Sequence, residues 1–101
     1  MTFDWDPDKS RQNRRKHGFG LEEAQAVFQD RELYVEYDER EYGEERWAAI
    51  GRPGSIIAYV VYTNRAGVVR LISARKANHE EESRYYRRWL CGKSARERTR
   101  S

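Results

Sequence analysis

The sequence has few of the thiol and imidazole side chains that form disulfides or typical zinc sites: one cysteine, Cys91, and two histidines among 101 residues. A single cysteine excludes an intramolecular disulfide framework and a zinc site of the common multi-cysteine type. The longest apolar run, residues 56–61, is far shorter than the roughly 20 residues that a membrane span requires. The N-terminus lacks a basic segment followed by an apolar one, so we expect no secretory signal and a cytoplasmic protein.

Large side chains, in contrast, are well represented, with three Trp, seven Tyr and three Phe. Disordered chains are poor in such residues, so we expect a folded protein. The length is typical of one small domain. We place that domain at residues 1–91 and expect a basic, mobile tail at residues 92–101.

Charge is abundant and unevenly distributed. Lys and Arg total 20 and Asp and Glu total 17, which gives a net charge of +3. Eight carboxylates lie between Asp30 and Arg46, whereas residues 65–76 hold four basic side chains and no acidic one. Such segregation suits a protein that presents one face to an anionic polymer, although charge runs often simply face water.

The N-terminal third predicts two helices. Asp6 and Pro7 are typical of a helix start and Gly18 of a helix end, which predicts a helix from Pro7 to His17. Apolar residues at helical spacing predict a second, short helix from Leu21 to Phe28.

The rest of the chain predicts four strands and a last helix. Alternating or continuous apolar residues place strands at residues 33–38, 46–51, 56–63 and 68–74, the third being the most buried. Asn78 followed by Glu81 has the form of a capping box for a helix over residues 79–90. The predicted fold is a small α+β domain with two N-terminal helices, a four-stranded antiparallel sheet and a C-terminal helix.

The sequence contains no glycine-rich phosphate loop, no Cys/His cluster and no glutamate–histidine metal motif, so we expect neither cofactor nor metal. RNA cleavage without a metal needs proton transfer and cations that stabilise the charged phosphorane. Residues suited to these tasks lie near the predicted strand ends: Arg46, Arg65, Arg75, Lys76, His79, Glu81 and Tyr85. Each also fits a purely structural role, such as a surface ion pair, a helix cap or a core tyrosine.

Several short motifs occur together in this sequence. The most specific is the Ile72-Ser73-Ala74-Arg75-Lys76-Ala77 block combined with Lys16-His17-Gly18. Further motifs are Phe3-Asp4-Trp5-Asp6, Glu22-Glu23-Ala24, Gly43-Glu44-Glu45-Arg46, Val60-Val61-Tyr62-Thr63 with Arg65, and Glu81 with Tyr85. Together they resemble one protein family, the BrnT-type toxins, and the similarity covers residues 3 to 90. Where the family commonly has Thr after Ala77, this chain has Asn78, which also caps helices.

The resemblance implies a RelE-like fold and a metal-independent ribonuclease that arrests translation. It also implies a cognate antitoxin that neutralises the toxin and joins it in repressing the operon at operator DNA, and we expect a heterotetramer. Carried over by motif, the catalytic candidates are Arg65, Arg75, Lys76, Glu81, Tyr85 and His79. The candidates for RNA binding are Arg46, Glu44, Lys16, His17 and Arg70.

As a hypothesis, Arg65 and Arg75 both hold the scissile phosphate, and Lys76, His79, Glu81 or Tyr85 transfers the proton. Two other interpretations remain open at this point. The chain could be a non-enzymatic toxin-like subunit that binds an antitoxin and modulates repression, or an RNA-binding domain that does not cleave.

Overall fold

The first helix, α1, runs from Pro7 to His17, as the sequence predicts. The Asp6 side chain accepts a hydrogen bond from the Asp8 N–H at 2.9 Å, and Gly18 ends the helix in a left-handed conformation with φ of 87°. The computed structural model describes residues 1–38 and 43–87. No helix in this part of the chain is long and apolar enough to cross a membrane.

The predicted second helix is two short elements. An α-helix, α2, spans Leu21–Ala24, and a 3-10 helix, η1, continues over Gln25–Gln29. Leu21, Ala24 and Val27 are all buried, and their spacing of three residues matches the three residues per turn of a 3-10 helix. The tighter second half therefore keeps the apolar residues on one line facing the sheet.

The sheet contains the four predicted strands and one more. Strands β2 (Tyr34–Asp38), β3 (Arg46–Gly51), β4 (Ala58–Arg65) and β5 (Val68–Lys76) pair in an antiparallel series. The expectation of a purely antiparallel, four-stranded sheet is wrong, because β1 (Thr2–Asp4) pairs in parallel with β5. The order is β1-β5-β4-β3-β2, which makes the sheet mixed and five-stranded.

The last described helix covers residues 79–87 and begins as predicted. The Asn78 N–H donates to the Glu81 carboxylate at 2.9 Å, and the Glu81 N–H donates to the Asn78 side chain at 2.9 Å. These two bonds form the predicted capping box. Residues 88–90 of the predicted helix, the tail at residues 92–101 and the C-terminal boundary of the predicted domain lie outside the described residues.

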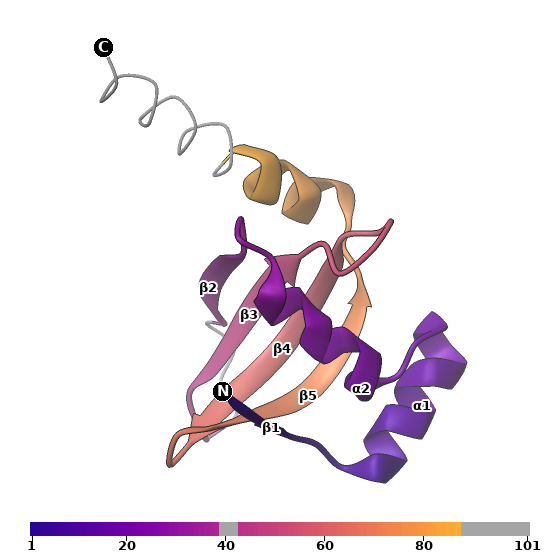
Figure 1. Cartoon of the computed structure of the whole chain (residues 1–101), viewed down its shortest axis with the longest axis vertical. Helices are drawn as coiled ribbons and strands as arrows, with labels where there is room; N and C mark the ends of the chain where they lie inside the picture. The colour runs from indigo at the N-terminus through magenta and orange to yellow at the C-terminus, as the bar shows by residue number, and fades with distance from the viewer. Residues whose placement is uncertain (39–42, 88–101) are drawn as a thin grey trace.

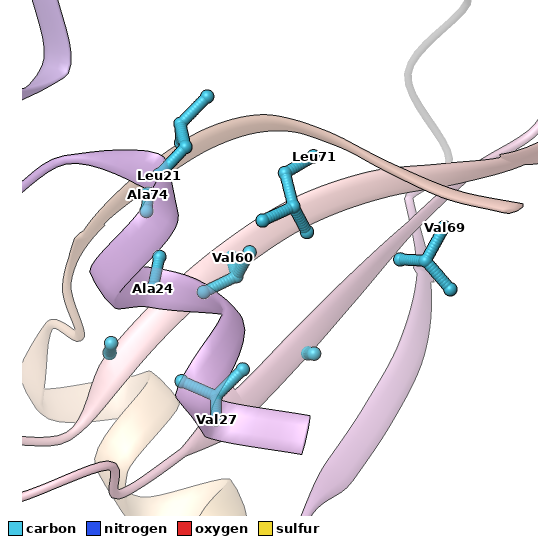
Figure 2. Packing of buried hydrophobic residues seen from close by; sticks show 9 residues of the cluster. Leu21, Ala24, Val27, Val60, Val69, Leu71 and Ala74 are labelled. Atoms are coloured by element: carbon cyan, nitrogen blue, oxygen red, sulfur yellow. The ribbon is translucent and has the colours of Figure 1, made fainter. Parts of the chain in front are cut away.

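The main core lies between the sheet and the first two helices. Both α1 and α2 contact β5, and η1 contacts β3, so these helices cover one face of the sheet (Figure 1). Figure 2 shows how the side chains of α2 and η1 meet those of β4 and β5 in this layer. The buried members of the core are Leu21, Ala24, Val27, Ala49, Ala58, Val60, Val69, Leu71 and Ala74.

A β-bulge in β5 changes which side chains face this core. Val61 is opposite Ser73 but Tyr62 is opposite Leu71, so Ile72 is an extra residue in β5. Leu71 and Ala74 consequently both point into the core, although they are three residues apart. The bulge has the same effect on the other face of the sheet: two β5 residues on either side of Ile72 can share that face although they are an odd number of positions apart.

Candidate functional site

The sheet face turned away from α1 and α2 carries four arginines, Arg46, Arg65, Arg70 and Arg75, and we call it the arginine face. On β4, residues 58, 60 and 62 pack against the helices, so alternation turns residues 59, 61, 63 and 65 to the arginine face. The register places Arg75 beside Tyr59 and Arg70 beside Thr63. Without the bulge at Ile72, Arg70 and Arg75 would point to opposite faces.

Arg75 is held rigidly at one end of this face. Its two terminal nitrogens donate to the two oxygens of Glu81, each at 2.7 Å, and its guanidinium lies 4.3 Å from the centre of the Tyr59 ring. The Glu81 side chain is only 6% exposed, against 38% for Arg75. A bidentate ion pair and a stacked ring together fix both the position and the plane of the guanidinium.

The ionisation of Glu81 follows from these contacts. Burial alone would raise the pKa of this carboxyl, but the hydrogen bonds from Arg75 and from the Asn78 N–H outweigh burial and leave the pKa below its usual value. Glu81 is therefore a carboxylate at neutral pH and a weak proton acceptor. Its position is suited to holding the Arg75 guanidinium in place.

Tyr85 is anchored in a similar way. Its hydroxyl donates to Asp30 at 2.6 Å, and its ring is buried with Ile50, Ile57 and Ala77 in a second, small core. Burial, followed by the hydrogen bond to Asp30, raises the pKa of Tyr85 well above its ordinary value. The hydroxyl thus keeps its proton and connects the last helix to the segment before β2.

A third link joins the same helix to the sheet. Arg84 donates from Nε to one Glu36 oxygen at 2.8 Å and from a terminal nitrogen to the other at 3.3 Å. Helix 79–87 is therefore fastened to β5, β2 and the segment before β2, and it covers one end of the arginine face (Figure 1).

The remaining three arginines surround Thr63 at the opposite end. Arg70 is opposite Thr63 on β5, and Arg46 reaches the same level on β3, where the Thr63 hydroxyl donates to the Glu45 carbonyl at 2.7 Å. Arg65 follows two residues later on β4 and is 59% exposed. This end of the face therefore presents three cations.

Two of these arginines have exposed carboxylate partners. Arg65 donates to both oxygens of Glu44 at 3.1 Å, and Arg70 donates to Asp4 at 2.6 Å across the β1–β5 pair. The Glu44 side chain is 32% exposed and the Asp4 side chain 55%. Exposed ion pairs are weak, so a phosphate group can compete for these arginines.

The two ends of the face lie apart along β4. Tyr59, which is paired with Arg75, precedes Arg65 by six residues on β4, and at ~3.3 Å per residue this is a backbone separation of about 20 Å. The separation favours contacts of Arg65 and Arg75 with different nucleotides of a bound strand. That both arginines hold the scissile phosphate stays a prediction.

Of the other four predicted residues, three lie on the helical side of the sheet and His79 lies on the last helix. Lys76 is exposed and follows Arg75, so alternation turns it toward the helical side of the sheet, in register with Ala58. His79 is exposed in the first turn of the last helix, two residues before Glu81. Lys16 and His17 are exposed at the end of α1, which packs on the helical side, so the structure does not bring them to the arginine face.

Sequence reasoning missed three contributors to the site, Tyr59, Glu36 and Asp30. Their roles depend on partners that lie far along the chain: Arg75 for Tyr59, Arg84 for Glu36 and Tyr85 for Asp30. Local sequence patterns do not predict such long-range contacts. Among the residues that the structure describes, no three His, Cys, Asp or Glu side chains gather as a metal ion requires.

The lowered pKa of Glu81 makes stability dependent on pH. The unfolded carboxyl takes up a proton at a pH where the folded one is still ionised, so we expect stability to be present above the ordinary pKa of glutamate and to be lost as the pH falls through the lower folded pKa. Melting temperatures between pH 7 and pH 3 test this, and Glu81→Gln should shrink the decrease. An equal decrease in both proteins would contradict the assignment.

Fold and site together define a small α+β domain whose sheet carries four arginines on one face. A family model described as the ribonuclease toxin BrnT of type II toxin–antitoxin systems matches residues 5–81. The 1.1 Å crystal structure of the Brucella abortus ribonuclease toxin, BrnT, is 25% identical with a TM-score of 0.61, over 78% of this chain and 99% of that one. No curated protein matches the sequence.

The chain belongs to the BrnT family of ribonuclease toxins of type II toxin–antitoxin systems. The resemblance found in the sequence motifs is thereby confirmed, as is the toxin function that it implies. Membership of a type II system also implies an antitoxin partner.

Proposed function

We propose that this toxin cleaves RNA on the arginine face by a metal-independent, RelE-like mechanism. The observation that carries the proposal is the bulge at Ile72, which turns Arg70 and Arg75 to the face that also holds Arg46 and Arg65. Several arginines on one face of a sheet suit a single RNA strand, because each guanidinium donates to phosphate oxygens through a planar fork.

The proposed roles differ between the two ends of the face. Arg75, fixed by Glu81 and stacked on Tyr59, stabilises the negative charge that develops on the scissile phosphate. Glu81 and Tyr85 act as positioning residues, because both are buried and already engaged. His79 is the candidate for proton transfer, since it is exposed, lies close to Arg75 in sequence, and carries an imidazole that can donate or accept a proton.

Arg46, Arg65 and Arg70 bind flanking phosphates. The phosphates compete with Glu44 for Arg65 and with Asp4 for Arg70, and Asp38 is opposite Arg46 in the sheet. Glu44 thus regulates the availability of Arg65 instead of contacting RNA. Lys76, Lys16 and His17 lie on the helical side and contribute at most to long-range attraction.

The activity is tested with the purified chain and single-stranded RNA, with and without EDTA, beside an Arg65→Ala/Arg75→Ala double variant. We expect cleavage by the wild type that survives EDTA, no cleavage by the variant, and growth arrest on induction of the wild type alone. Cleavage that disappears with EDTA would refute the metal-independent mechanism.

Removal of the Glu44 charge should raise RNA affinity, whereas removal of an arginine should lower it. Glu44→Gln frees Arg65 from its carboxylate, so we expect RNA affinity to rise about twofold to fivefold, the equivalent of one exposed ion pair. Arg65→Ala should lower the affinity instead. Binding isotherms at fixed salt measure both changes, and a loss of affinity in Glu44→Gln would place Glu44 among the RNA contacts.

One observation favours a non-enzymatic alternative: Arg65, Arg70 and Arg75 each already carry a carboxylate partner. In that case the chain binds its antitoxin and modulates repression without cleaving RNA. Normal growth and intact RNA after induction of folded protein would support this alternative.

The partners that we propose follow from the family. A cognate antitoxin neutralises the toxin in the cytoplasm, forms a heterotetramer with it and carries it to operator DNA. Size measurement of the co-expressed pair tests the assembly, and a strict 1:1 heterodimer would contradict it.

A further inference from the structure

The helical layer leaves one of the two edge strands of the sheet, β2, uncovered. Helices α1 and α2 contact β5, and η1 reaches β3, but in the described part of the chain no helix lies over the helical side of β2 (Figure 1). The sheet order places β2 at the edge, where β3 is its neighbour on one side. The outer edge of β2 therefore offers backbone groups to a further strand.

Apolar side chains gather on this uncovered surface. Val35 and Tyr37 are 37% and 49% exposed, and the Tyr37 ring contacts Trp47 edge-on, with centroids 5.0 Å apart. Trp47 is paired in turn with Tyr62, whose ring packs against Phe28 beside the main core. Val35, Tyr37 and Trp47, which we call the β2 strip, thus extend the core outward to the edge of the sheet.

The surroundings of the β2 strip are acidic. Residues 30–38 and 43–47 contain six carboxylates and two arginines, in a chain whose net charge is +3, and two of these carboxylates, Glu36 and Glu44, are paired with Arg84 and Arg65. Edge-to-edge pairing of two β2 strands would bring like charges together, so this corner disfavours a second copy of the chain. A cationic polypeptide is the occupant that the charge favours.

We propose that the β2 strip and the outer edge of β2 bind an extended segment of the antitoxin in which apolar residues alternate with Lys or Arg. The bound segment adds a strand to the sheet. Its apolar side chains pack on Val35 and Tyr37, and its basic side chains face the side of β2 that carries Glu36. Naming the antitoxin as the partner rests on the proposed function, whereas the surface and its chemistry do not.

The first test uses the intact complex. Hydrogen–deuterium exchange is compared for the full chain alone and with its co-expressed antitoxin. We expect slower exchange at the amides of residues 34–38 in the complex. Unchanged exchange in this strand, in a complex that is otherwise protected, would overturn the proposal. RNA cleavage by the free chain, measured separately, reports on the proposed enzymatic function and does not depend on β2.

The second test uses substitutions and a matched control. Val35→Lys with Tyr37→Lys replaces two exposed apolar side chains by cations, so we expect antitoxin affinity to fall at least about tenfold without loss of the melting transition. Ile56→Lys makes the same change at another exposed position, 38% exposed and outside β2, and should leave affinity within about twofold. Equal affinities for all three proteins would overturn the proposal.

A third test needs no antitoxin. Nine-residue peptides that alternate valine with lysine, or valine with glutamate, are titrated into the full chain while its amide resonances are followed. The lysine peptide should shift the amides of residues 34–38 and the glutamate peptide should not. Equal responses to both peptides, or no response to either, would count against the proposed chemistry.

Discussion

Replacement of Arg75 by Ala should abolish RNA cleavage and growth arrest and should also destabilise the protein. Loss of a fixed cation from the charge that develops in the reaction costs on the order of 100-fold or more in rate. The same change leaves the buried Glu81 carboxylate without its bidentate partner, which costs about 2–4 kcal/mol for a partly buried pair. Single-turnover cleavage assays and thermal melts measure the two effects.

A second substitution separates the two effects. In Arg75→Ala/Glu81→Gln residue 81 carries a neutral amide, so no buried charge is left without a partner. We therefore expect part of the lost stability to return while cleavage stays absent. Arg75→Lys keeps a charge but loses the planar fork, and it should retain only a small fraction of the activity. Recovery of cleavage along with stability in the double variant would mean that Arg75 acts only through the fold.

The triple variant Arg46→Ala/Arg65→Ala/Arg70→Ala should lose most of its RNA affinity and much of its dependence on salt. Each phosphate contact on a single strand contributes about 0.7 to the slope of log affinity against log salt, so three lost contacts should lower the slope by about 2. The affinity should fall roughly 100-fold at low salt, since charge-assisted hydrogen bonds are worth ~1.5–3 kcal/mol each before competition from Glu44 and Asp4.

A control with the same change in charge is available on α1. Lys9→Ala/Arg11→Ala/Arg15→Ala removes three exposed cations from the helical side of the sheet. We expect the salt slope to stay close to the wild-type value, because these residues do not line the arginine face. Equal slopes for the two triple variants would indicate attraction by overall charge instead of contact on one face.

Most elements of the fold could be predicted from local pattern. The bounds of α1 and β3 follow from caps and alternation, and the capping box at Asn78 and Glu81 follows from two residues at the required spacing. Strand β1 was missed because three residues, with only Phe3 partly buried, are too short for a period to be detected. Its pairing with β5 depends on contacts between the two ends of the chain.

The site was less predictable than the fold. Motif resemblance selected Arg75 and Glu81, but whether Arg70 and Arg75 share a face depends on the register of β4 and β5. The extra residue at Ile72 has no local signature, since it is one apolar residue among others. Resemblance also gave no distances, so the separation of Arg65 from Arg75 emerged only from the strand pairing.

The bulge links the spacing of two arginines to the pairing of β5. Deletion of Ile72 would remove the extra residue and leave the β4–β5 pairs in their present register, so Arg70 and Arg75 would stay on one face, now four residues apart. Five residues with regular pairing would instead turn one of the two arginines into the core layer. Relatives with the same two arginines should therefore space them either four residues apart with regular pairing or five apart with a bulge.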